Sequence, residues 1–352
     1  MNEITNTTEP QIAYSECCAL PFDSVIHSDF LNNNLPDKCA NLIIADPPYY
    51  KVKGEFDFIW KTFADYLADV EKWAIECKRV LADNGTLLWY GDAKNIAYAQ
   101  IIFDKHFNLL NSIVWENTND HKQQIKFNED LRTFAPLTER ILMYEQRGQK
   151  TGGELIFEQF LKPKNPFSKY LKVEFKNANI TNKEIAKLFP SRTGGLTGCV
   201  SNWLNGDNVI TEEQYDTTRE YLKFEYLNKP YEELKAEYEE LKAEYEELKA
   251  EYEELRRPFN NALHLGDVIR LPNYETSKYD HDTIKPEKLT RILINTCSRP
   301  NDIVIVPFAG SGTEVVMSIK EGRKAIGYDI EKKYVDMSNA RIKTFKDAPT
   351  LF

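Results

Sequence analysis

The chain has 352 residues, 42% of them hydrophobic, and a formal net charge of −10 at pH 7. This length allows one large domain with an insertion or two domains, and no apolar stretch approaches the roughly 18 residues that span a membrane. The amino-terminal segment is polar, and the six cysteines are scattered without a CxxC pair. We therefore expect a cytoplasmic protein with no membrane segment, no disulfide framework and no metal site.

The first 145 residues alternate apolar runs with helical pattern. Residues 60–82 repeat apolar positions at spacings of three and four, which predicts a helix. Strands that alternate with helices predict a mostly parallel sheet covered on both faces. The expected strands are Ser24–His27, Asn41–Ala45, Thr86–Tyr90, Ser112–Glu116 and Arg140–Tyr144.

The sheet pattern returns near the carboxyl terminus. The pattern predicts a strand followed by a glycine turn within Asn301–Thr313. It then predicts a helix at Glu314–Gly322 and a further strand at Lys324–Asp329. Residues 150–280 differ in character from both flanks. The simplest architecture is one α/β sheet whose two halves are separated in sequence by an insertion.

The insertion contains a basic segment. Residues 161–200 carry eight lysines and arginines against two glutamates, and a local basic patch is what attraction to phosphate requires. Two short helices, Ile180–Phe189 and Thr197–Gly206, are expected around the turn Ser191–Gly195. This arrangement resembles a helix-turn-helix, with a plain helical hairpin as the alternative.

Six polar residues of this segment are candidate contacts to DNA bases or phosphates. Thr181 and Glu184 form a capping-box pattern at the start of the first helix. Trp203 and Leu204 are expected in the core. The candidate DNA contacts are Lys183, Lys187, Arg192, Thr197, Ser201 and Asn202.

The heptapeptide YEELKAE occurs three times in tandem from Tyr231. Tyr and Leu alternate at spacings of three and four, which predicts one long helix with a heptad seam, ending before Pro258 and reaching about 38 Å at 1.5 Å per residue. The seam predicts a coiled-coil contact, within the chain or in a homodimer. A solvated spacer helix held by Glu–Lys pairs is the alternative.

The glycine turn PFAGSGT follows the strand near residue 306. Gly310 and Gly312 let the backbone approach a ligand closely at the carboxyl end of a strand. Asp329 ends the next strand, where an acid can accept hydrogen bonds from ribose hydroxyls. The pattern fits a nucleoside cofactor. The chain has neither a full GxGxxG nor a Walker GK[ST] motif, which disfavours a dinucleotide site and a nucleotide triphosphatase.

The stretch DPPYY, residues 46–50, follows the apolar run Asn41–Ala45. Two consecutive prolines cannot continue a strand ladder, because each lacks an N–H and has a fixed φ. A short buried strand is therefore expected to end here, with a carboxylate and a tyrosine held on a rigid turn. Such a turn holds the acceptor groups of Asp46 and Pro47 and an aromatic ring rigidly at the end of the strand.

DPPYY and PFAGSGT together resemble the S-adenosylmethionine-dependent amino-methyltransferases of DNA. In that family an (Asp/Asn/Ser)-Pro-Pro-(Tyr/Phe) tetrad is the active site and an FxGxG turn holds the cofactor. The order here, with the tetrad first, a basic insertion between and the turn last, resembles the circularly permuted β class. The resemblance covers residues 24–145 and 262–342 and implies a Rossmann-like methyltransferase sheet.

The resemblance implies two sets of site residues. The catalytic set is Asp46, Pro47, Pro48 and Tyr49, with the ring of Tyr49 stacking on the extruded base. The cofactor set is Asp29, Lys285, Phe308, Gly310, Gly312, Thr313 and Asp329. Lys285 belongs to the segment His281–Pro286, and Asp29 occupies the place of an acid near the cofactor adenine.

Val306 departs from the family pattern, which usually has an acid directly before PFAGSGT. That acid commonly binds the methionine amino group of the cofactor. Asp302 lies about 13 Å back along the strand, at 3.3 Å per residue, and is not an obvious replacement.

The expected activity is site-specific methylation of adenine N6 in double-stranded DNA, because an Asp-headed tetrad is typical of adenine enzymes in the family. Cytosine-N4 methylation is an alternative with the same amine chemistry, and a catalytically weak DNA-binding protein is another, motivated by Val306. Related RNA and protein-glutamine enzymes usually carry Asn where this chain has Asp46. A homodimer and a restriction enzyme are the other expected partners.

Four segments are expected from these patterns. Residues 1–148 form the catalytic half of the methyltransferase domain, and residues 259–352 form its cofactor-binding half. Between them lie the target-recognition insertion, residues 149–225, and the heptad-repeat helix, residues 226–258.

Overall fold

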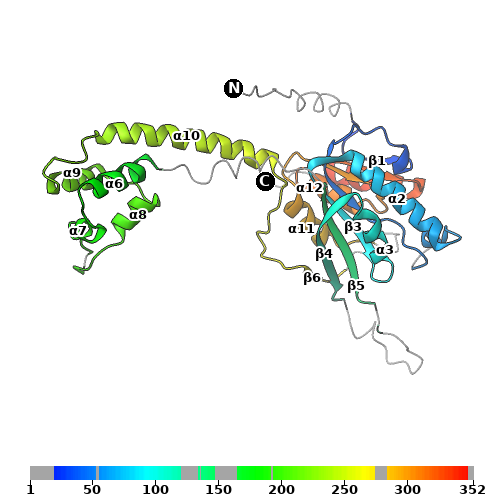
Figure 1. Cartoon of the computed structure of the whole chain (residues 1–352). Coiled ribbons are helices and arrows are strands. Elements are labelled where there is room, and N and C mark those ends of the chain that lie inside the picture. The colour runs from blue at the N-terminus through cyan, green and yellow to red at the C-terminus, as the bar shows by residue number, and fades with distance from the viewer. Residues whose placement is uncertain are drawn as a thin grey trace. The chain divides into compact units, whose positions relative to one another are not determined.

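The computed structural model describes residues 20–52, 55–119, 134, 136–146, 165–191, 193–273 and 284–347. The chain divides into two compact units: residues 1–149 together with 257–352, and residues 150–256 (Figure 1). Within the described ranges, we find no helix with the length and apolar character needed to cross a membrane.

The first unit is built on an eight-stranded sheet in the order β1-β8-β7-β2-β3-β5-β4-β6. Among the described strands β5 alone runs against its neighbours, β3 and β4; every other pairing is parallel. The mostly parallel sheet expected from the sequence is thus confirmed, with β5 as an exception that the sequence did not indicate. The strands are β1 (Ser24–His27), β2 (Ala40–Ala45), β3 (Leu81–Asp92), β4 (Phe107–Asn117), β5 (Thr138–Gln146), β6 (Val268–Leu271), β7 (Ile303–Val306) and β8 (Lys324–Asp329).

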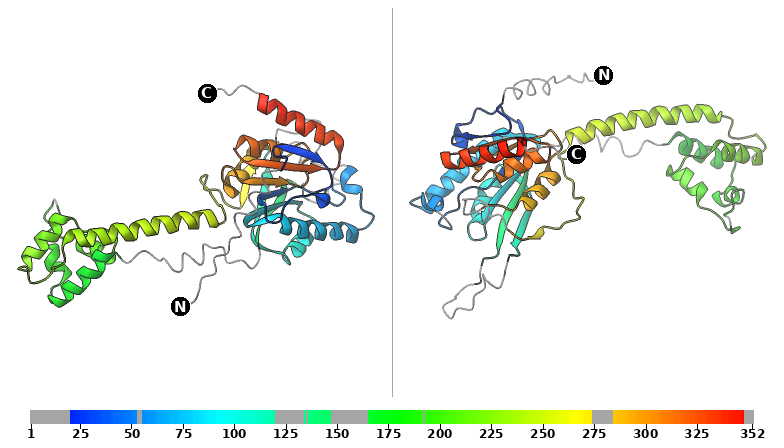
Figure 2. Two further views of the ribbon diagram at one scale, coloured as in Figure 1. Left: turned by 90° about the horizontal axis from the view of Figure 1, so that it is seen from above. Right: turned by 180° about the vertical axis from the view of Figure 1, so that it is seen from behind.

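Helices cover both faces of this sheet (Figure 2), as the alternation of strand and helix predicts. Successive strand residues point to opposite faces, so Ile43 and Leu87 join one core while Leu42 and Leu88 join the other. The first core is closed by α2 (Phe63–Val80) and α3 (Ile96–Phe103). The second is closed by α11 (Glu287–Cys297), α12 (Thr313–Lys320) and α13 (Lys332–Asp347).

The helix expected at residues 60–82 is α2, which is shorter at both ends. It begins after a capping box in which Thr62 Oγ1 accepts from the backbone N–H of Asp65 and the Asp65 carboxylate accepts from that of Thr62. It ends at Val80 because β3 begins at the next residue. Short 3₁₀ turns η1 (Phe30–Asn32) and η2 (Glu55–Phe58) complete this part of the unit.

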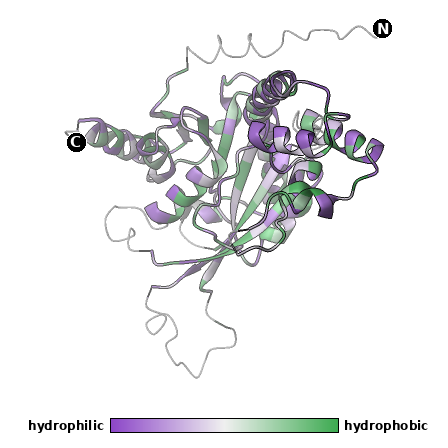
Figure 3. Cartoon of the chain, turned by 90° about the vertical axis from the view of Figure 1, so that its left-hand side faces the viewer, coloured by the Kyte–Doolittle hydropathy of each residue, from purple (hydrophilic) through white to green (hydrophobic). Residues whose placement is uncertain are grey.

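The second unit has its own hydrophobic core, in which Phe167, Trp203 and Tyr215 are fully or almost fully buried. The burial of Trp203 and Leu204 confirms the expectation that they are core residues. The hydrophobic colour of Figure 3 is concentrated on the strands of the first unit, whereas the outward helix faces are hydrophilic. The helices of the second unit are α6 (Pro166–Asn177), α7 (Asn182–Ala186), α8 (Cys199–Asn205), α9 (Glu212–Tyr221) and α10 (Tyr231–Leu255).

The two short helices expected in the basic segment are α7 and α8. The Thr181–Glu184 capping box is formed at the start of α7. Gly206 ends α8 in the left-handed conformation, with φ of 80°, which glycine adopts without steric cost.

Helix α10 contains the three YEELKAE repeats. Its first seam residues pack inside the unit, because the rings of Tyr231 and Tyr238 lie 5.2 and 6.4 Å from the ring of Phe167 on α6. Leu234 is 1% exposed in the same core. Leu248, further along the seam, is half-buried. Each repeat also carries an exposed Glu–Lys ion pair at a spacing of three, as in Glu232–Lys235.

Candidate active site

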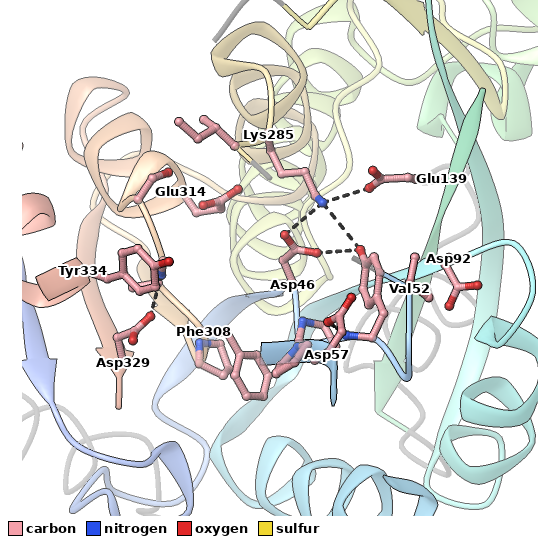
Figure 4. Close-up of a pocket in the computed structure, with 18 of the residues that line it drawn as sticks. Asp46, Val52, Asp57, Asp92, Glu139, Lys285, Phe308, Glu314, Asp329 and Tyr334 are labelled. Atoms are coloured by element: carbon pink, nitrogen blue, oxygen red, sulfur yellow. Dashed lines mark hydrogen bonds and ion pairs between the residues drawn. The ribbon is translucent and has the colours of Figure 1, made fainter. Parts of the chain in front are cut away.

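A cavity of about 1510 Å³ lies at the carboxyl edge of the first unit's sheet. Strands β1, β2, β7 and β8 are parallel and therefore end at this edge, while the antiparallel β5 begins there. Figure 4 shows Asp329 and Tyr334 toward one end of the cavity and Glu139 and Asp92 toward the other. Nine residues of the two expected site sets line it: Asp29, Asp46, Pro47, Pro48, Tyr49, Lys285, Phe308, Gly310 and Asp329.

Asp46 lies directly after the last residue of β2, which ends at Ala45 as the two prolines predict. Its carboxylate accepts a hydrogen bond of 2.6 Å from the hydroxyl of Tyr49 at one oxygen. Its other oxygen lies 2.9 Å from the ammonium nitrogen of Lys285. Each oxygen keeps a lone pair, so the carboxylate can still accept from a ligand in the cavity.

Lys285 is 4% exposed and joins two carboxylates, because its nitrogen also lies 2.8 Å from Glu139 Oε2. Burial alone would lower the pKa of Lys285, but Asp46 and Glu139 outweigh that effect and raise it, so the ammonium keeps its charge. Burial raises the pKa of Asp46; Lys285 opposes this rise and Glu139 adds to it. The cluster therefore holds two carboxylates, those of Asp46 and Glu139, against the one ammonium of Lys285.

The chain around Asp46 is fixed by further hydrogen bonds. Asp57 Oδ1 accepts from the backbone N–H of Tyr49 at 2.5 Å, and the Asp57 carbonyl accepts from the N–H of Lys51 at 2.8 Å. The side-chain amide of Asn95 donates to the carbonyl of Tyr50 at 3.1 Å. Burial raises the pKa of Tyr49, which keeps its hydroxyl protonated as the donor to Asp46.

The glycine turn joins β7 to α12 and is bound to the end of β8. Asp329 accepts from the backbone N–H groups of Gly310 at 2.7 Å and Glu331 at 2.8 Å, and burial raises its pKa. Ser338 on α13 donates to the carbonyl of Gly310 at 2.9 Å. These contacts hold the turn with Asp329 beside it in the cavity.

Gly312 and Thr313 do not line the cavity. Gly312 has a φ of 76°, and a Cβ there would meet the Ser338 side chain at 2.6 Å. Thr313 is fully buried, with its hydroxyl 3.0 Å from that of Ser311 and 3.2 Å from Arg341. Both residues therefore pack on the side of the turn that faces away from the cavity. Asp29 lines the cavity and caps η1 by accepting from the N–H of Leu31 at 2.9 Å.

Glu139 and Glu314 are among the acids of the cavity that the sequence pattern missed. Glu139 pairs with Asp92 in the antiparallel register of β5 and β3, and only that strand direction brings it to this edge. Glu314 follows the glycine turn directly and is 5% exposed. A charged residue just after a glycine turn, in a helix that packs on the sheet, is a signal that could have indicated it.

The expected DNA contacts belong to the second unit. Lys183, Lys187 and Ser201 are exposed, and Asn202 is half-buried. Thr197 is half-buried too, and its hydroxyl donates to the carbonyl of Phe189 at 2.9 Å. Arg192 lies outside the described residues.

Among the described residues no group of three or more His, Cys, Asp or Glu side chains is arranged to hold a metal ion. Cys39, Cys77 and Cys297 are buried in the two cores of the sheet, which fits small apolar side chains. Val306 is fully buried, and Asp302 lies before the start of β7, at the opposite end of that strand from the cavity.

A family model described as DNA methylase, N6_N4_Mtase, matches residues 40–340. The chain therefore belongs to this family of DNA amino-methyltransferases, which confirms the resemblance drawn from DPPYY and PFAGSGT. The family includes enzymes of both the N6 and the N4 type, as its name states.

Two curated relatives match over most of their length. DNA adenine methyltransferase YhdJ of Escherichia coli (strain K12) is 25% identical over 329 residues, which cover 91% of this chain and 82% of YhdJ. Type II methyltransferase M.HinfI of Haemophilus influenzae is 23% identical over 349 residues, covering 92% and 71%. Among solved structures, the M1.HpyAVI–SAM complex is 18% identical with a TM-score of 0.46, covering 91% of this chain and 98% of that one.

Replacing Gly312 by alanine is expected to destabilise the protein in two ways. The left-handed backbone costs about 1–2 kcal/mol with a Cβ present, and the clash with Ser338 adds about 1–3 kcal/mol of overpacking. The free energy of unfolding, from chemical denaturation, measures the sum.

Gly322→Ala is the matched control, because Gly322 has a φ of 78° but no atom within 4 Å of an added Cβ. It should show the backbone cost alone. Equal losses in the two variants would contradict the packing of the turn against α13, and Gly312→Ala combined with Ser338→Gly should recover part of the difference.

Proposed function

We propose that this protein is a site-specific DNA adenine-N6 methyltransferase that uses S-adenosyl-L-methionine. The observation that carries the proposal is the half-buried Asp46 carboxylate, which Tyr49 and Lys285 hold in the same cavity that the glycine turn lines. Membership of the DNA methylase family supplies the reaction class.

In this proposal Asp46 and the carbonyl of Pro47 accept hydrogen bonds from the exocyclic amine of an extruded base. An amine conjugated to a base ring is a poor nucleophile because its lone pair is delocalised, and two acceptors favour a more tetrahedral nitrogen. Tyr49 offers its ring for stacking, and Pro48 stiffens the turn. Since no covalent enzyme intermediate is needed, positioning and electrostatics supply most of the acceleration.

The residues at the other end of the cavity fit the cofactor. When bound, S-adenosyl-L-methionine supplies an activated methyl group on a sulfonium. Asp329 keeps free lone pairs beside the glycine turn and is placed to accept from ribose hydroxyls, while Asp29 and Phe308 line the space for the adenine. Acidic side chains in the lining also suit a ligand that carries two positive groups.

Adenine is favoured over cytosine by two observations. The tetrad is headed by Asp46, and an Asp head is typical of adenine enzymes in the family that the sequence resembles. A relative that matches 91% of the chain is a DNA adenine methyltransferase by name.

Double-stranded DNA is the proposed substrate, and we propose that the second unit binds it and recognises its sequence. Lys183, Lys187 and Ser201 expose donors on and beside the two short helices α7 and α8, within the basic segment. Thr197 and Asn202 are the half-buried members of the set, and Arg192 completes it. A restriction enzyme of the same specificity stays a predicted partner.

Asp46→Ala is expected to lower the single-turnover rate of methyl transfer by about 100-fold or more, because it removes the group that orients the amine. Transfer of a tritiated methyl group to unmethylated DNA measures the rate, and a gel-shift titration should give unchanged DNA affinity. Asp83→Ala is the control, since Asp83 forms an exposed ion pair with Lys38 and does not line the cavity, so its loss should leave the rate intact. A near-normal rate for Asp46→Ala would refute the assigned role.

Asp329→Ala is expected to weaken binding of S-adenosylhomocysteine by about 1–3 kcal/mol, the scale for losing a hydrogen-bonding partner. Asp302→Ala is the matched control, because Asp302 also accepts a backbone hydrogen bond, at 2.6 Å from Arg299, but lies at the far end of β7. Titration calorimetry compares the two. An unchanged dissociation constant for Asp329→Ala would mean that other groups hold the ribose.

The Tyr and Leu positions of α10 that follow Tyr238 are proposed to form a homodimer contact. Deleting one repeat, residues 238–244, shortens the helix by about 10.5 Å and preserves its apolar face, since seven residues make almost two turns. Self-association should therefore weaken while the register survives, as sedimentation near the dissociation constant would show. An unaltered monomer–dimer balance would favour the spacer helix instead.

A further inference from the structure

Glu314, the second residue of α12, lines the cavity and has no described role in the proposed reaction. It is 5% exposed, and in Figure 4 its side chain points toward Asp46. Its Oε1 atom is buried and has no hydrogen-bond partner among the residues that the structure describes. An unpaired acceptor in a buried site is costly, so it indicates a donor that arrives with a ligand.

The charged groups around Glu314 do not neutralise it. Asp46, directly after β2, and Tyr90 on β3 face it and add no positive charge. Lys285 faces it but is shared by Asp46 and Glu139. The last facing group is the guanidinium of Arg341 on α13.

Arg341 is engaged elsewhere. Its guanidinium donates to the carbonyl of Ser311 at 2.5 Å and to the hydroxyl of Thr313 at 3.2 Å, and it lies 3.5 Å from Glu287. Burial, together with the charge of Asp46, raises the pKa of Glu314 to about 7. The carboxylate is therefore held in an unfavourable place that no described structural partner explains.

The neighbouring positions along β7 offer no acid to the cavity at the start of the turn. Val306 ends β7 with an apolar side chain, and Asp302 accepts from the N–H of Arg299 at the other end of the strand. Each oxygen of Asp329 already accepts one backbone hydrogen bond, from Gly310 of the turn or from Glu331. Within the described part of the chain, the Oε1 atom of Glu314 accepts no hydrogen bond.

We infer that Glu314 accepts a hydrogen bond from the ammonium group of the methionine part of S-adenosyl-L-methionine, an inference that rests on the proposed function. The cofactor has two cationic groups, but a sulfonium carries no N–H and cannot satisfy an acceptor. An ammonium brings three donors and a full charge. Glu314 on α12 thus provides the acidic partner for the ammonium group, in place of the acid that is absent at Val306 on β7.

Titration calorimetry with three ligands tests the inference on Glu314→Gln. S-adenosylmethionine and S-adenosylhomocysteine both carry the ammonium, whereas 5′-methylthioadenosine keeps the nucleoside and lacks it. Loss of a charge-assisted hydrogen bond should weaken the first two by about 10- to 100-fold and leave the third within about twofold.

Each other outcome overturns the inference. Weakening of S-adenosylmethionine alone would assign Glu314 to the sulfonium, and equal weakening of all three would assign it a structural role. No weakening would leave it without a ligand contact. If the wild-type protein bound none of the three, the proposed function itself would fail.

Thermal unfolding of the ligand-free protein supplies a second readout. Because the pKa of Glu314 is raised on folding, its charge destabilises the folded state as pH rises through about 7, and the effect is absent below the unfolded pKa. Glu314→Gln should therefore raise the melting temperature at pH 8 and leave it nearly unchanged at pH 4. A lower melting temperature at pH 8 would point to a structural partner.

Glu321→Gln is the matched control, since Glu321 directly follows α12 and forms an ion pair with Arg291 at 2.7 Å, away from the cavity. It should leave the affinity for all three ligands unchanged. A loss of S-adenosylhomocysteine binding in this variant equal to that in Glu314→Gln would also contradict the inference.

Discussion

The ion pair between Lys285 and Asp46 is the interaction on which the candidate site depends. A carboxylate at the end of a buried strand would be strongly destabilised without a cation, and Lys285 lies 2.9 Å away with 4% of its side chain exposed. Glu139 shares the same ammonium, so the cluster keeps one negative charge in excess. That residual charge, in a cavity lined by further acids, is suited to cationic ligands and to amine donors.

The sheet brings these groups together from distant parts of the sequence. Strand β2 places Asp46 at the carboxyl edge of the sheet. Lys285, in the segment before α11, lies beside Asp46 at the same edge. Because β5 is antiparallel to β3, its first residues lie at the same edge, and Glu139 is one of them. Because both faces of the sheet are packed by helices, the edge is where polar side chains of parallel strands can gather around a ligand.

Short-range sequence features made several parts of the candidate site predictable. Two prolines end β2 after Ala45, and the glycine turn and its acid, Asp329, follow from spacing alone. The partners of buried charges could not be predicted in the same way. Lys285 was expected near the cofactor, and its pairing with Asp46 and Glu139 depends on contacts between residues far apart in the chain. The sequence predicts only that Glu314 belongs to a helix, since its burial is set by how α12 packs.

Analysis of the methylated nucleosides is the most direct measurement of the central claim. Unmethylated DNA is incubated with the purified protein and S-adenosyl-L-methionine, digested to nucleosides and separated by mass spectrometry. The half-buried Asp46 carboxylate, placed to accept a hydrogen bond from an adenine amine, predicts N6-methyladenine at one sequence context. N4-methylcytosine in its place would contradict the assigned base, and no methylated nucleoside would contradict the assigned activity.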